Sequence, residues 1–191
     1  MQALQSIICD IIEGKRGGRG IAFFLYLCSR LYAGAGFLRN LAYDKKWLKD
    51  TSVDAVVISI GNIVSGGTGK TPFIHHLAKE LEGFCKLAIL SRGYRSKMEH
   101  APSPQKLDRQ KGGAEEWGDE PCWLAAQLPD VDVWVGKRRS LSAALASSQG
   151  AQVILLDDGM QYRHLKRDIE IALIDACDPF GKGYFLPRGY L

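Results

Sequence analysis

A glycine-rich segment of the chain carries the residue types that bind phosphate. Six consecutive residues could take part: Gly66, Gly67, Thr68, Gly69, Lys70 and Thr71. Glycines allow successive backbone N–H groups to converge on one anion, and a helix that begins here would add its positive end. Lys70 would reach the terminal phosphates of a nucleotide, and the Thr71 hydroxyl would bind Mg²⁺. The usual phosphate-loop pattern has glycine where this chain has Val64, so a glycine-rich turn with a chance Gly-Lys-Thr is the alternative.

A pair of carboxylates supplies the second group that a magnesium nucleotide needs. The apolar run QVILL ends at Asp157 and Asp158, which are followed by Gly159. Adjacent carboxylates repel each other unless a dication or a solvated turn lies close. An Asp-Asp-Gly turn without a metal is the alternative. Together with the upstream loop, the pair predicts a Mg²⁺ site.

Charged and aromatic residues follow other apolar runs in the same way. Arg92 and Tyr94 come directly after one run, and Arg139 follows another. Ligands of open α/β folds bind at the carboxyl ends of strands, so we expect these side chains near the nucleotide. Asp119 and Glu120 precede Pro121 at the start of a helical segment, which fits either a plain helix cap or a catalytic role.

Apolar runs alternate with helical segments from Val53 onwards, and this rhythm predicts the fold. The expected strands are Ala55–Ile60, Lys86–Leu90, Val131–Val135, Gln152–Leu156 and Ile169–Asp175, and the expected helices are Pro72–Leu81, Glu120–Leu128 and Arg138–Ser148. The polar segment Ser96–Gly118 is expected to be mostly loop. The pattern indicates an α/β fold of the P-loop NTPase type, with a mostly parallel sheet and helices on both faces.

The first part of the chain has a different character. Basic residues precede the apolar segment Gly20–Leu38. A signal peptide, a membrane-spanning helix, an interfacial helix and a helix packed on the domain's own core all fit such a segment. Arg30 lies in the middle of the segment and disfavours a span, and a cytosolic nucleotide site disfavours a signal peptide. A partly polar stripe on an apolar helix favours association with a membrane surface.

The overall composition excludes some classes of protein. With 46% hydrophobic and 24% charged residues among 191, the chain has an ordinary globular composition. A net charge of +4 is mild, and basic tracts interleaved with aromatic residues are missing, so no nucleic-acid partner is expected. Five scattered cysteines favour neither a disulfide framework nor a zinc site and suggest a reducing compartment.

Taken together, these segments resemble the tetraacyldisaccharide 4′-kinases, the lipid A kinases of Gram-negative bacteria. The resemblance covers 43–191 and is carried in order by SIGNIVSGGTGKTP, LSRGYRSK, GDEP, VGKRR, ILLDDGMQYRHLKRDIEIALID and LPRGYL. The chain departs from the family pattern at Met160-Gln161-Tyr162, where Phe-Gln-His is usual, and at Arg188 and Tyr190, which replace small residues.

The resemblance implies a reaction and a set of roles. ATP would phosphorylate the 4′-hydroxyl of a tetraacyl glucosamine disaccharide 1-phosphate at the cytoplasmic face of the inner membrane, giving lipid IVA. Lys70 and Thr71 match the nucleotide loop, and Asp119 matches the acid that takes the hydroxyl proton. The other matching positions are Asp157, Asp158 and Glu120 around Mg²⁺, and Arg92, Tyr94 and Gln161 toward the substrate; Arg139 and Lys70 are expected to join Asp119 as catalytic residues.

The same resemblance sets the expected organisation and the competing functions. We expect a membrane-associating segment at 1–42 and a kinase lobe at 43–191, whereas the family continues into a second lobe that supplies a catalytic histidine. A nucleotide- and membrane-binding fragment without turnover is therefore the alternative function. A regulatory or metallochaperone-type NTPase would need an Asn-Lys-x-Asp motif or clustered Cys and His residues, and the sequence has neither.

Overall fold

The computed structural model describes residues 10, 12, 19–64 and 67–191. The chain falls into two compact units. The first comprises Met1–Lys49, Ile63–Thr68 and Ile174–Leu191, and the second comprises Asp50–Asn62 and Gly69–Leu173. Besides Met1–Lys49, the first unit thus includes the end of the described chain and part of the glycine-rich loop.

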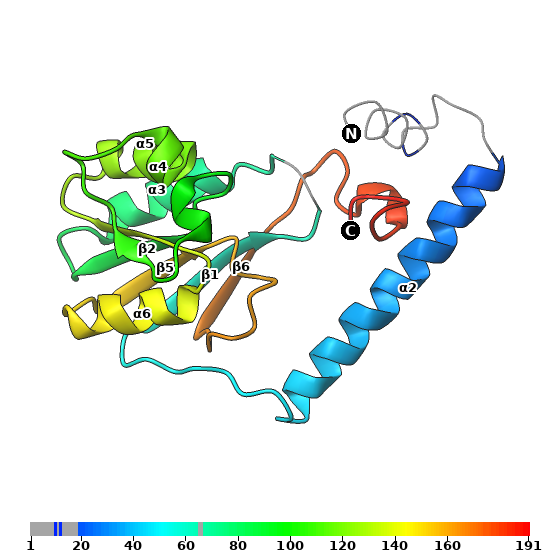
Figure 1. Cartoon of the computed structure of the whole chain (residues 1–191), viewed down its shortest axis with the longest axis horizontal. Helices are drawn as coiled ribbons and strands as arrows, with labels where there is room; N and C mark the ends of the chain where they lie inside the picture. Colours follow the sequence, from blue (N-terminus) through cyan, green and yellow to red (C-terminus); the bar gives the residue numbers. More distant parts are fainter. Residues whose placement is uncertain (1–9, 11, 13–18, 65–66) are drawn as a thin grey trace. The chain divides into compact units, whose positions relative to one another are not determined.

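The second unit contains one mixed, mostly parallel sheet (Figure 1). Its strands are β1 (Val56–Asn62), β2 (Leu87–Ser91), β3 (Gln105–Lys106), β4 (Asp132–Val135), β5 (Val153–Asp157) and β6 (Ile169–Leu173). Their order is β3-β4-β2-β5-β1-β6, and only the β3–β4 pairing is antiparallel. All the carboxyl ends of β1, β2, β4 and β5 therefore lie at one edge of the sheet.

Alternating side chains on the central strands build two hydrophobic layers. Leu87 and Ile89 of β2 belong to one buried cluster, and Ala88 and Leu90 belong to the other. Because strand side chains alternate between faces, a continuous apolar run is the expected sequence of a strand that is covered on both sides.

Helices cover both faces of this sheet (Figure 1). They are α3 (Lys70–Leu81), the short α4 (Ala114–Trp117), α5 (Asp119–Gln127) and α6 (Arg139–Ser148). Residues of α3, α4 and α5 join the cluster of Ile89, whereas Ala143 and Ala146 of α6 pack with Ala88 on the opposite face.

The α/β fold predicted from the alternation is confirmed, and the predicted strands and helices occur within one or two residues of their expected bounds. The polar segment expected to be loop is more ordered than its composition indicates. It contains the 3₁₀ helix η1 (Lys97–His100), the strand β3 and the helix α4. Contacts with the core order it: Met98, Leu107 and Trp117 are buried in the cluster of Ile89.

The first unit contains α2 (Arg19–Asp44) and the short 3₁₀ helix η2 (Gly181–Gly183). Within the described residues, one helix, Gly20–Asp44, has the length and apolar composition to cross a membrane. Large apolar side chains are exposed along α2: Phe23, Phe24, Leu27, Leu31, Phe37 and Leu38. Tyr26 meets Tyr184 edge-to-face with ring centroids 6.1 Å apart, which connects α2 to the segment around η2.

A substitution in the central strand tests the packing of the sheet unit. Ile89 is fully buried, whereas Ile169 of β6 is 49% exposed. Ile89→Ala should lower the free energy of unfolding by about 2–5 kcal/mol, because it removes buried methylenes and leaves a cavity. The matched Ile169→Ala change should cost under about 1 kcal/mol. Urea unfolding followed by circular dichroism measures both, and equal costs would contradict the described burial.

Candidate active site

A cavity of about 440 Å³ opens where the strands end. Its walls include the predicted site residues Lys70, Arg92, Tyr94, Asp119, Glu120, Asp157 and Asp158. These residues come from α3, from the loop after β2, from the start of α5 and from the end of β5. The parallel strands bring them to one edge although they are far apart in sequence.

A second cavity of about 450 Å³ shares Asp119 and Glu120 with the first. Its other walls are Thr71, Pro72 and Trp123. The predicted phosphate-loop threonine therefore lies beside the same two carboxylates as the predicted lysine, because the first turns of α3 and α5 adjoin both cavities.

The lysine is held by an asparagine at the end of the neighbouring strand. Lys70 Nζ donates a hydrogen bond of 2.9 Å to Asn62 Oδ1. Gly69 precedes α3 at φ 78°, a left-handed conformation that suits glycine. Asn62 was not singled out from sequence, since an amide at a strand end carries little information until its partner is known.

Asp157 is the most electrostatically unusual residue of the cavity. It is 6% exposed, and Ser91 Oγ donates a hydrogen bond of 3.1 Å to its Oδ2. Its Oδ1 is buried and has no hydrogen-bond partner. Burial raises the pKa of this carboxyl from 3.8 to about 6, and the negative charges of Glu120 and Asp158 add to the shift, while Ser91 and Arg139 oppose it.

Two arginines fix the backbone of the turn that carries the acidic pair. Arg139 Nη1 donates to the carbonyl oxygens of Asp157 and Asp158, at 2.9 Å each. Arg167 Nη1 lies 3.4 Å from the carbonyl oxygens of Gly159 and Met160. Four successive carbonyls thus face guanidinium groups. Asp158 adopts φ 49°, a left-handed conformation that aspartate tolerates better than most residues.

Two glycines bring the other walls together. A Cβ atom at Gly93, whose φ is 68°, would clash with Val135 Cγ1. The ideal Cβ position of Gly118, φ 97°, lies 3.4 Å from Gly93 Cα. The loop after β2 therefore touches the residue before α5. Gly118 occupies the cap position of α5, so Asp119 is its first helical residue rather than its cap.

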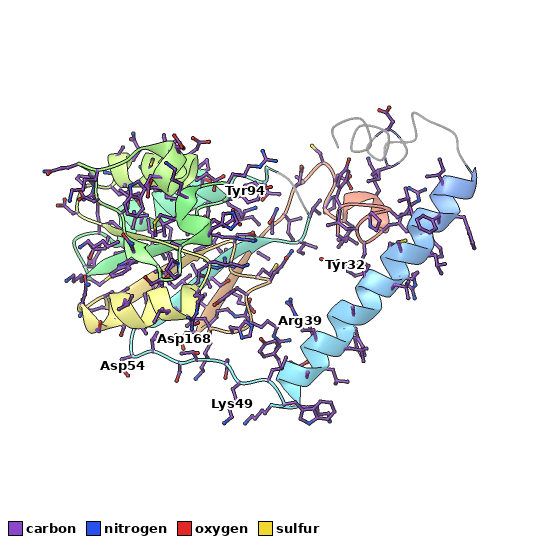
Figure 2. All side chains as sticks on the ribbon, in the orientation of Figure 1. Tyr32, Arg39, Lys49, Asp54, Tyr94 and Asp168 are labelled. Atoms are coloured by element: carbon purple, nitrogen blue, oxygen red, sulfur yellow. The ribbon has the colours of Figure 1, made fainter. Side chains whose placement is uncertain are left out.

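The arginine of the same loop is held by a buried acid. Arg92 Nε lies 2.9 Å from Glu99 Oε1, and the other oxygen of Glu99 accepts a hydrogen bond of 2.8 Å from the Arg95 backbone N–H. Glu99 is only 7% exposed. Tyr94 is 66% exposed and lies in the loop after β2 (Figure 2). The sequence did not indicate a role for Glu99, because this residue lies in the polar segment that was expected to be loop.

The remaining predicted residues are placed differently. Arg139 is buried and its guanidinium faces backbone oxygens, so it is not among the residues that line the two cavities. Gln161 is exposed in the turn after the acidic pair and does not line them either. Gly66 lies outside the described residues, and Gly67 and Thr68 belong to the first unit.

Comparison with known proteins assigns this arrangement to a family. The family described as tetraacyldisaccharide-1-P 4′-kinase matches residues 21–191. The chain belongs to the tetraacyldisaccharide 4′-kinase family. A tetraacyldisaccharide 4′-kinase of Halothermothrix orenii is 39% identical over 98% of this chain and 50% of its own length. That of Anaeromyxobacter sp. (strain Fw109-5) is 39% identical over 96% of this chain and 51% of its own.

A solved kinase of the same family shares the fold. The crystal structure of LpxK from Aquifex aeolicus in complex with ATP superposes with a TM-score of 0.79 and 36% sequence identity. The match covers 90% of this chain and 54% of that one. The chain thus spans about half the length of the curated kinases that it matches.

The donor set of the cavity fits the magnesium ion that the sequence led us to expect. Mg²⁺ prefers oxygen ligands, usually one or two carboxylates together with substrate phosphates and water. The unpartnered Asp157 Oδ1 is a buried carboxylate oxygen of this kind, and Asp158 and Glu120 line the same cavity. A dication beside this carboxylate would favour its charged form.

The buried carboxylate makes a measurable prediction about stability. Because the pKa of Asp157 is higher in the folded chain, the folded chain binds more protons than the unfolded chain between pH 4 and 6. Stability should therefore fall as the pH rises through this window, by up to about 3 kcal/mol. Asp157→Asn should remove that loss and raise the midpoint of urea unfolding at pH 8 in EDTA.

The comparison isolates one group, because other carboxylates titrate in both proteins. The difference in unfolding free energy between wild type and Asp157→Asn should grow from pH 4 to pH 6 and then stay constant. A difference that does not change across this window would contradict the raised pKa.

Proposed function

We propose that this chain provides the nucleotide-binding lobe of a lipid kinase. In the proposed reaction ATP transfers its γ-phosphate to the 4′-hydroxyl of a tetraacyl glucosamine disaccharide 1-phosphate, giving lipid IVA. The observation that carries the proposal is the shared cavity. Lys70, Asp119 and the pair Asp157–Asp158 come together in one cavity at the carboxyl edge of the sheet, as phosphoryl transfer requires.

One group of the predicted site residues would bind the nucleotide phosphates and the metal ion. Lys70 would exchange its bond to Asn62 for the terminal phosphates, and Arg92, held by Glu99, would add a second positive charge. Thr71, Asp157, Asp158 and Glu120 would hold Mg²⁺, which neutralises phosphate charge. Gly66, Gly67, Thr68 and Gly69 would supply backbone N–H groups to the phosphates.

The other group of predicted site residues would act on the sugar that accepts the phosphate. Asp119 lines both the cavity that contains Lys70 and Asp157 and the cavity that contains Thr71 and Trp123, which supports a position near both substrates. There it would accept the proton of the sugar hydroxyl during transfer. Tyr94 and Gln161 are exposed and would contact the substrate. Arg139 would assist catalysis by holding the backbone of the acidic pair.

A membrane surface is the proposed location of the lipid. The exposed apolar side chains of α2 support this proposal, because monomeric soluble proteins seldom expose so many large apolar groups together. Arg30 and Arg39 lie on the same helix and suit an anionic surface. We place the chain at the cytoplasmic face of the inner membrane, where ATP is available.

Substitution of the proposed base tests the chemistry. Asp119→Asn should lower phosphate transfer from ATP to the disaccharide monophosphate by about 10²–10⁴-fold, because the hydroxyl loses its proton acceptor. ATP affinity should stay close to that of the wild type. Asp130→Asn, an exposed acid in the loop after α5, is the matched control. Product is measured by thin-layer chromatography with radiolabelled ATP.

The length of the tested chain separates the two candidate functions. A version extended to the full family length should form the bisphosphorylated lipid, and failure to do so would contradict the proposed reaction. Nucleotide binding by the 191 residues without transfer would identify them as a binding fragment. Transfer by the 191 residues alone would exclude that alternative.

Vesicle binding tests the role of α2. Changing Phe23, Phe24 and Leu31 together to serine should reduce sedimentation with phosphatidylglycerol-containing vesicles at least tenfold, since each large apolar side chain contributes about 1.5–3 kcal/mol when buried. The control is Phe84→Ser, at an aromatic residue that is 87% exposed in the sheet unit. Equal binding by both variants would contradict a membrane-contacting helix.

A further inference from the structure

The ring of Tyr162 packs against the guanidinium that holds the acidic turn. Arg139 Cζ lies 4.4 Å from the centroid of this ring. Arg139 is only 7% exposed, and its Nε is buried without a hydrogen-bond partner. A buried guanidinium needs compensation for its charge, because burial removes it from water. The face of an aromatic ring attracts a cation, and the attraction is strongest where water is excluded.

The hydroxyl of Tyr162 fixes the position of that ring. The Ser140 backbone N–H donates to Tyr162 Oη at 3.2 Å, and Ser140 Oγ lies at the same distance from it. At the other end, the Tyr162 N–H donates to the Gly159 carbonyl at 2.9 Å. The side chain therefore connects the first turn of α6 with the turn that follows Asp158.

We infer that Tyr162 is a positioning residue: by holding Arg139 against the carbonyls of Asp157 and Asp158, it orients the two carboxylates for a magnesium nucleotide. The tyrosine occupies the place where histidine is usual in the resembled motif. Its ring packs against the Arg139 guanidinium, and its hydroxyl oxygen accepts a hydrogen bond from the Ser140 backbone N–H. The magnesium part of this inference rests on the proposed function, whereas the contact between the ring and Arg139 does not.

Hydrogen exchange tests the positioning without any ligand. The Gly159 N–H donates to the Ile60 carbonyl at 3.1 Å, so its protection reports whether the turn is closed. Tyr162→Leu keeps an apolar side chain but removes the ring, and exchange in a peptide covering 157–162 should become about tenfold faster. Tyr162→Phe and, at pH 8, the neutral ring of Tyr162→His should retain most of the protection.

The matched control is Phe84→Leu, another change from aromatic to leucine at an exposed site. It should leave exchange at 157–162 unchanged. Unchanged exchange in Tyr162→Leu would overturn the inference. Faster exchange that spreads equally through β2 and β4 would also overturn it, because the tyrosine would then be a general packing residue.

Nucleotide binding provides the second arm, measured by calorimetry with ATP. In Mg²⁺, Tyr162→Leu should bind ATP about tenfold more weakly than the wild type, whereas in EDTA the two should bind alike. Recovery in Tyr162→Phe would show that the ring carries the effect. Equal affinities in Mg²⁺ would overturn the inference. A wild-type chain that binds no ATP would refute the proposed function, while the exchange experiment would still decide the role of Tyr162.

Discussion

The site depends on keeping negative charge at the end of a buried strand. Asp157 is the last residue of β5 and is buried at the carboxyl edge of the sheet. One of its carboxylate oxygens accepts a hydrogen bond from Ser91, and the other has no hydrogen-bond partner. Such a group is costly in the folded chain because burial disfavours its charged form. The guanidinium groups of Arg139 and Arg167 do not neutralise it directly. They donate hydrogen bonds to the carbonyls of the turn instead, so the carboxylate stays available to a ligand.

The parallel sheet explains why residues so distant in sequence meet. Each parallel strand ends at the same edge of the sheet, and β1, β5 and β2 are neighbours there. The loop after β1 leads to Lys70, the end of β5 carries the acidic pair, and the loop after β2 carries Arg92. Close contact between Gly93 and Gly118 then brings Asp119 to the same cavity. The architecture and the site are thus consequences of one strand order.

Sequence reasoning predicted what depends on local pattern. Apolar runs such as the one before Asp157 identify strands that are covered on both faces, and the residue types at their ends indicate phosphate and metal chemistry. It could not predict interactions decided by tertiary contacts. The short strand β3 pairs for only two residues and is ordered by β4, and Glu99 is recognisable only once it is buried beside Arg92. Arg139 illustrates the same limit, because a basic residue after a strand can face the ligand or, as here, the backbone.

The packing of α6 has a further consequence for how the protein tolerates change. Ala143 and Ala146 pack with Ala88 of β2, and methyl-sized side chains allow a helix to approach a sheet closely. The same helix begins at Arg139. The small size of these alanines therefore determines how close the helix lies to the sheet, and so whether the Arg139 guanidinium can contact the acidic turn. A larger residue at Ala143 would lift the helix and withdraw Arg139 from the turn. Substitutions that displace the acidic turn should therefore also occur at alanines that line neither cavity.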